Sequence, residues 1–144
     1  MMVTMDTNVL FAALTSGRGA SNVLLNLVFA EKVALALSLP IVLEYEAVLT
    51  RPENSELLRL SSDQVPDLVD FLALLAKKSD SYFLWRPNLR DETDNIFWEC
   101  AFTSGSQYLI TANTKGFQNA QLINLTFEIV TPAQFISLWR THHA

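Results

Sequence analysis

Carboxylate and amide side chains stand at the ends of expected strands, near the start of one expected helix and within another. They are Asp6, Glu46, Asp91, Asp94 and Asn113. A hard cation takes oxygen ligands, which several separate segments of a chain supply together. These residues come from well-separated segments, so their types and spacing are compatible with a site for a hard cation.

Each of these positions also has a purely structural explanation. Asp6 lies in an Asp-Thr-Asn sequence, which is good turn chemistry after a strand. Asp94 fits the first turn of a helix, where the helix dipole favours an acid, and Thr93 fits the N-cap. Thr111 is compatible with an ordinary strand threonine. Residue type alone leaves both explanations open at each position.

Two glutamates compete for one position on the helix that Pro40 is expected to open. At 100° per residue, Glu46 neighbours Val42 and Leu49 at one edge of the apolar stripe. Glu44 lies at the opposite edge of the same stripe. Periodicity therefore does not choose between the two glutamates, and either fits a solvated flank.

The elements that position these residues alternate along the chain. Short apolar runs predict strands over 3–5, 33–37, 82–84, 108–111 and 127–130. Periodicity and capping signals predict helices over 22–30, 40–50, 57–60, 65–77, 94–103 and 131–139. Ser21 is the expected N-cap of the first helix, and Gly105 suits the C′ position after the fifth. Thr131 and Gln134 fit a capping box, with proline at N1.

The alternation of strands and helices predicts an α/β fold, a three-layer α/β/α sandwich with a mostly parallel central sheet. The chain has 144 residues, of which half are hydrophobic, so one domain over 1–144 with one core is expected. In such sheets the ligand crevice lies beyond the carboxyl ends of the strands. Asp6 and Asn113 are therefore expected at the crevice.

Composition excludes several classes of protein. A single cysteine, Cys100, rules out a disulfide framework or a zinc site built on cysteines, and it reads as a buried small hydrophobe. His142 and His143 end the chain and are expected to fray. No signal peptide or membrane span is visible, so we expect a cytoplasmic protein. Neither GxGxxG nor GxxxxGK[ST] occurs, which disfavours nucleotide-binding enzymes.

The net charge of −5 is unfavourable for binding nucleic acid, because such affinity comes mostly from neutralised phosphates. A carboxylate cluster is acidic by necessity, however, so the objection is partial. A metal ion and nearby cationic side chains would then have to neutralise the charge of the phosphate.

The order of these segments resembles the PIN-domain nucleases, and among them the small VapC-like bacterial group described as toxins of toxin–antitoxin pairs. The resemblance covers nearly the whole chain. It is carried by MDTNVL at 5–10, EYEAVL at 44–49, RDETDN at 90–95 with ECA at 99–101, YLITAN at 108–113 and FEIVTPAQF at 127–135. Any one segment is only weakly specific for the family, whereas the order and spacing of the segments together are more specific.

The resemblance implies an endoribonuclease that uses Mg²⁺ or Mn²⁺ to activate water against single-stranded RNA. Asp6, Glu46 and Asp94 match the three principal carboxylates of the family, which selects Glu46 over Glu44. These three, with Asn113, are the implied metal ligands.

Two positions depart from the fullest pattern of the family. Asn113 falls where many members carry a fourth aspartate, and Gly116 stands where relatives often have another acid. The site is therefore less charged, and we expect weaker metal binding with one occupied metal position instead of two.

The resemblance also implies supporting residues and partners. Asn8, Thr111 and Asp91 are expected to support the site. Candidate phosphate contacts are Arg51, Arg86, Arg90 and Lys115, each of which also fits a solvated surface cation. The implied partners are an RNA substrate, a cognate antitoxin and a second copy in a homodimer. Trp85 and Trp139 are candidate interface aromatics.

Two other interpretations compete with the nuclease. The first is a PIN-like module that binds RNA or protein without cleavage, for which Asn113 and Gly116 argue. The second is another α/β protein, such as a receiver domain. A receiver needs a phosphoacceptor aspartate at the end of a middle strand, whereas the strand 33–37 ends in Ser38-Leu39-Pro40.

Overall fold

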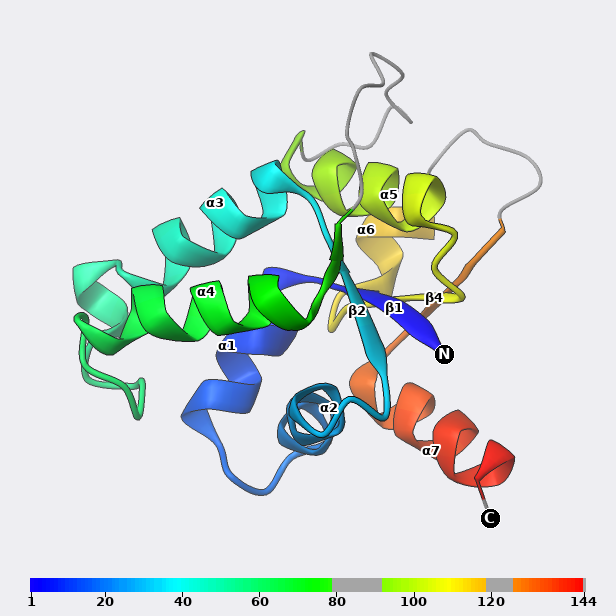
Figure 1. Cartoon of the computed structure of the whole chain (residues 1–144), viewed down its shortest axis with the longest axis horizontal. Helices are drawn as coiled ribbons and strands as arrows, with labels where there is room; N and C mark the ends of the chain where they lie inside the picture. Colours follow the sequence, from blue (N-terminus) through cyan, green and yellow to red (C-terminus); the bar gives the residue numbers. More distant parts are fainter. Residues whose placement is uncertain (79–91, 119–125, 144) are drawn as a thin grey trace.

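A parallel sheet forms the centre of the molecule (Figure 1). The structure is a computed structural model that describes residues 1–78, 92–118 and 126–143. Within these residues five strands pair in the order β3-β2-β1-β4-β5, and every neighbouring pair is parallel. They are β1 (Met2–Met5), β2 (Ala34–Leu37), β3 (Lys77–Lys78), β4 (Tyr108–Ile110) and β5 (Glu128–Val130). The predicted parallel sheet is confirmed.

Helices lie on both sides of this sheet and complete the predicted three layers. They are α1 (Thr7–Thr15), α2 (Ala20–Phe29), α3 (Leu39–Leu49), η1 (Pro52–Asn54), α4 (Gln64–Leu75), α5 (Glu92–Ser104), α6 (Thr114–Gln118) and α7 (Pro132–His142). Figure 1 shows α5 on one side of the sheet and α1, α2 and α7 on the other. The central strand β1 is accordingly apolar except for Thr4 and buried from Val3 onward, as expected of a strand covered on both faces.

The topology brings the ends of β1 and β4 together. The chain leaves β1 toward β2 on one side, whereas β4 lies on the other side and pairs Met5 with Ile110. The connections thus diverge at β1, and a ligand crevice forms at such a point beyond the carboxyl ends of the strands. Asp6 and Thr111, which follow these two strands, are neighbours for this reason.

Several local elements differ from the sequence prediction. The chain over 57–60 forms turns and bends, so the short helix expected there is wrong. The helix expected over 65–77 ends at Leu75, and Lys77 belongs to β3. The helices α1 and α6 were not predicted. The expected strand 82–84 lies outside the described residues.

The ends of the helices show which capping signals in the sequence predicted a helix boundary correctly. The capping box of Thr131 and Gln134 is formed, and Gly105 has a left-handed φ of 71° after α5, as predicted. Ser21 and Thr93 are wrong as N-caps because both lie inside their helices, and Gly19 occupies the N-cap of α2.

The C-terminal helix is longer than expected. It continues through His142 instead of ending at Trp139, and the ring centroids of His143 and Trp139 lie 4.4 Å apart in a stacked arrangement. Within the described part of the chain, none of the helices combines the length and apolar character needed to cross a bilayer.

Candidate functional site

Asp6 lies where β1 ends and α1 begins. It occupies the N-cap position of α1, yet its side chain makes no capping hydrogen bond. Instead, Asp6 Oδ2 accepts a hydrogen bond of 2.7 Å from the hydroxyl of Thr111, beyond the end of β4. Only 8% of Asp6 is exposed. The carboxylate is therefore directed across the end of the sheet, which disfavours the alternative that it merely caps a turn.

Thr111 is fully buried and links two predicted site residues. Besides donating to Asp6, its hydroxyl oxygen accepts a hydrogen bond of 3.1 Å from the backbone N–H of Asn113. Nearby, Asn8 Oδ1 accepts one of 3.2 Å from the backbone N–H of Ala112. The start of α1 is thus tied twice to the segment after β4, and both Thr111 and Asn8 support this junction.

Asp94 and Asn113 converge above Gly116, a glycine of α6. A Cβ atom added to Gly116 would lie 3.2 Å from Asp94 Oδ2 and 3.2 Å from Asn113 Nδ2. Contacts this short are crowded, so a side chain here would push against both residues. The absence of an acid at Gly116, which the sequence showed as a departure, therefore leaves space between two predicted ligands.

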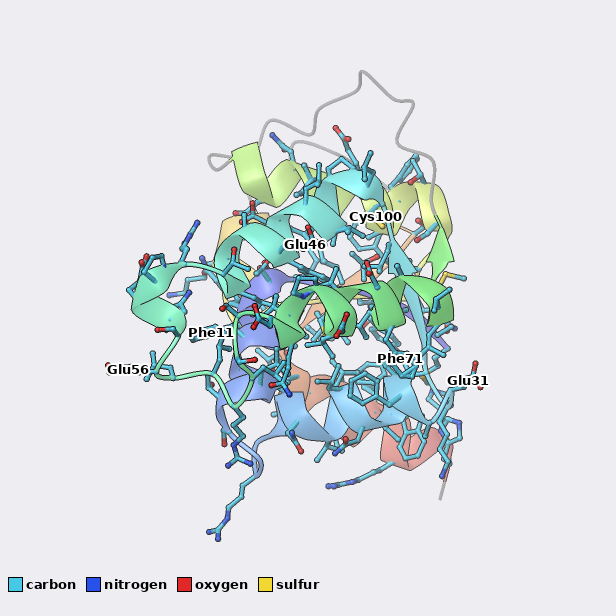
Figure 2. The ribbon with its side chains drawn as sticks, turned by 60° about the vertical axis from the view of Figure 1, so that its left-hand side comes forward. Phe11, Glu31, Glu46, Glu56, Phe71 and Cys100 are labelled. Carbon is cyan, nitrogen blue, oxygen red and sulfur yellow. The ribbon has the colours of Figure 1, made fainter. Side chains whose placement is uncertain are left out.

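Glu46 lies on α3, where Figure 2 labels it. This helix packs against α1 and α5, the two helices that begin beside Asp6 and Asp94. Glu46 and Glu44 are both half-buried, so burial does not choose between them. The assignment of Glu46 stays a prediction that rests on the family pattern.

Tyr45, the residue before Glu46, is buried at the junction of these elements. Its hydroxyl donates a hydrogen bond to the carbonyl oxygen of Met5, the residue before Asp6. Burial raises the pKa of Tyr45 well above its usual value, and the charges of Cys100 and Asp6 raise it further. The phenol therefore remains a neutral hydrogen-bond donor close to the Asp6 carboxylate.

The side chains at this edge of the sheet offer oxygen atoms, which are the ligands that a hard cation prefers, but only a few of them lie close together. Among the described residues no group of three histidine, cysteine, aspartate or glutamate side chains lies close enough together to hold a metal. Asp94 and the Asn113 amide lie at Gly116, and Thr111 links the Asp6 carboxylate to the Asn113 backbone. Mg²⁺ keeps several waters and needs only one or two carboxylates from the protein, so this reduced donor set fits it.

The remaining predicted residues fall into three groups. Arg51 and Lys115 are exposed, as required of phosphate contacts and equally of solvated cations. Cys100 belongs to the core as predicted, together with Tyr45, Phe97 and Trp98. Burial raises the pKa of the Cys100 thiol to about 11. Asp91, Arg86, Arg90 and Trp85 lie outside the described residues.

Sequence reasoning did not show that the hydroxyl of Tyr45 reaches β1, because no local pattern of the chain records this contact. It also did not predict the burial of Glu99 on α5, which is only 6% exposed. The available signal for this burial was the position of an acid inside the apolar run 96–102.

Comparison with known proteins gives the family of this fold. The model of the PIN domain matches residues 2–115. Among curated proteins, none matches the sequence. A chain in the crystal structure of VapBC2 from Rickettsia felis, bound to a DNA fragment from their promoter, superposes with a TM-score of 0.62. The two sequences are 15% identical, and the match covers 91% of this chain and 98% of that one. That likeness concerns the fold, whereas the family model spans most of the sequence, so the chain belongs to the PIN-domain family.

Proposed function

We propose that this PIN-domain protein is an endoribonuclease that uses Mg²⁺ or Mn²⁺ to cleave single-stranded RNA. The observation that carries the proposal is the Asp6 carboxylate, which Thr111 holds at the point where the sheet connections diverge. Asp94 and Asn113 converge at Gly116, and a backbone hydrogen bond from Asn113 to Thr111 connects the two pairs. Family membership supports the same reaction class.

Asp6, Asp94 and Asn113 would hold the cation, with Glu46 contributing directly or through water. A bound divalent cation lowers the pKa of its water and stabilises charge on a phosphate. Two carboxylates about 4 Å apart repel by about 4 kcal/mol at an effective dielectric constant near 20. Since Asn113 replaces a charged ligand with a neutral one, we propose a single occupied metal position.

The protein's own groups would bind and orient the RNA. Lys115 is exposed in α6, two residues after Asn113, and is the best-placed candidate among the described cations to contact a phosphate. The chain's two histidines lie at its end, so carboxylates and not imidazoles would orient the attacking water. This arrangement needs no covalent intermediate on the protein.

A toxin–antitoxin setting is part of the proposal. The structural neighbour VapBC2 from Rickettsia felis was solved bound to a DNA fragment from their promoter. By analogy we propose a cognate antitoxin and a homodimer as partners of this chain, and the cytoplasm as the place where it meets RNA. A small DNA-binding protein encoded in the adjacent reading frame would support this setting.

The test is cleavage of a mixed single-stranded RNA by purified protein with Mn²⁺, with Mg²⁺ and with EDTA. We expect cleavage with either cation and none with EDTA. Asp94→Asn should lower the rate by at least about a hundredfold, the scale on which catalytic groups of this kind act. The matched control is Asp70→Asn, which removes one exposed carboxylate from α4 and should leave cleavage unchanged.

A second candidate function is a PIN module that binds RNA or protein without cleaving it. The observation in its favour is that no group of three metal-binding side chains forms within the described residues, where Asn113 stands in for an acid. Retained RNA binding with no cleavage under any cation would favour this module. Cleavage that Asp70→Asn and Asp94→Asn affect equally would contradict the assigned site.

A further inference from the structure

The pairing of the central strand β1 with β2 ends before β1 reaches Asp6. β1 pairs with β2 at Met2–Ala34 and Val3–Leu35, whereas the second half of β2 pairs with β3. The carbonyl of Met5 therefore lies beyond the β1–β2 ladder, at the edge where β2 gives way to α3. A buried backbone carbonyl needs a donor, and the hydroxyl of Tyr45 supplies it.

This single hydrogen bond connects the peptide segments that carry two site carboxylates. Met5 immediately precedes Asp6, and Tyr45 immediately precedes Glu46 on α3. The rest of the Tyr45 side chain is fully buried, so its ring is packed on all sides between the two segments. The distance between α3 and the end of β1 therefore depends on the position of the Tyr45 ring.

The same ring also contacts the third element of the site. The rings of Tyr45 and Phe97 are 6.3 Å apart and tilted by 30°. Phe97 lies one turn after Asp94 on α5. Among the described residues, Tyr45 therefore contacts the segments of Asp6 and Asp94 while it is itself adjacent to Glu46.

We propose that Tyr45 is a positioning residue of the metal site, and that its hydrogen bond to Met5 fixes the position of the Glu46 segment of α3 relative to the Asp6 segment. The role of the carboxylates rests on the function proposed above. The position of Tyr45 does not require it to touch metal or RNA. A residue with a purely structural role would change stability without changing how tightly the folded protein binds metal.

The test compares Tyr45→Phe with Ser106→Ala. Tyr45→Phe keeps the ring and removes only the hydroxyl. Ser106→Ala removes another fully buried hydroxyl, which bonds to Thr4 of β1 at 2.9 Å, within the core and not at the end of the sheet. Mn²⁺ binding is measured by calorimetry, and thermal unfolding of the metal-free proteins gives their stability.

We expect both variants to lose stability, because each loses a buried hydrogen bond. Only Tyr45→Phe should also lose Mn²⁺ affinity, by about tenfold, which corresponds to about 1.4 kcal/mol. In a Glu46→Gln background the same substitution should have little further effect on affinity, since the two changes act through one ligand. That coupling would show that Tyr45 acts through Glu46.

Unchanged Mn²⁺ affinity in Tyr45→Phe, or an equal loss in Ser106→Ala, would overturn the positioning role and leave the nuclease proposal intact. If the unmodified protein binds no Mn²⁺, the metal site and the positioning role both fail. Should Tyr45→Phe not fold, Phe97→Leu is the second variant, because it removes the ring contact and keeps the hydroxyl. A loss of Mn²⁺ affinity would then support the proposal, and unchanged affinity would overturn it.

Discussion

At the scale of residues, the direction of each hydrogen bond around Thr111 follows from donor chemistry. The backbone N–H of Asn113 can only donate, so the hydroxyl oxygen of Thr111 accepts from it. The single hydroxyl proton is then free to go to Asp6, which as a carboxylate only accepts. Thr111 thereby transmits the position of the Asn113 backbone to the Asp6 carboxylate.

The neutral side chain of Asn113 is the residue-scale feature that most affects metal binding. Asn113→Asp would add a carboxylate beside Asp94, because both side chains already lie against Gly116. We expect Mn²⁺ to bind about tenfold more tightly. The gain is only a part of the full charge–charge interaction, because solvent screens that interaction at an exposed position. Without metal the variant should be less stable, since the two carboxylates repel.

Isothermal calorimetry and thermal unfolding with and without Mn²⁺ check both effects. The matched control is Asn26→Asp, which adds the same charge at an exposed position of α2. It should leave Mn²⁺ affinity unchanged. Equal affinities in the parent protein and Asn113→Asp would argue against Asn113 as part of the metal site.

At the scale of elements, long amphipathic segments with capping signals were predictable and short ones were not. The motif of Thr131 and Gln134 placed the start of α7 correctly, because both hydrogen bonds of a capping box are local. The helix α6 has only five residues, including a glycine, and β3 has only two. Such elements have too few residues for a period to appear, and neighbouring elements stabilise them.

Thr131→Ala tests the contribution of that cap to stability. The substitution removes the side-chain acceptor of the Gln134 N–H, and we expect the free energy of unfolding to fall by about 1 kcal/mol. Urea denaturation measures the change. Thr141→Ala is the control, because it removes an exposed hydroxyl from the last turn of the same helix and should cost less. RNA cleavage should be unaffected by either variant, and a large loss of cleavage in Thr131→Ala would tie α7 to the site.

At the scale of the whole molecule, the acidic charge makes metal binding and folding interdependent. The chain has a net charge of −5, and its candidate ligands come from segments far apart in sequence that meet only in the folded state. A cation that binds only this state stabilises it by mass action. At a hundred times its dissociation constant, Mn²⁺ should add about 2.7 kcal/mol to the free energy of unfolding.

This stabilisation is measured as a rise in the midpoint of thermal unfolding, which we expect to be several degrees at saturating Mn²⁺. Asp94→Asn should lose most of the rise, whereas Asp70→Asn should keep it. A rise of equal size in all three proteins would indicate that Mn²⁺ binds elsewhere on the acidic surface.

The sequence by itself determined the α/β class, the parallel sheet and the residues at the ends of its strands. It did so because apolar runs, helical periods and capping signals are local properties of the chain. The same reasoning placed Asp6 and Asn113 at one edge of the sheet, since the ends of parallel strands share that edge.

Only the tertiary structure decided what each of these residues does there. Asp6 could have capped α1, and the packing of β4 beside β1 directs it to Thr111 instead. Asp94 and Asn113 both lie against Gly116, and the phenol of Tyr45 reaches Met5 across forty residues of chain. Contacts of this kind depend on how distant segments pack, and the local pattern of a single chain carries no record of them.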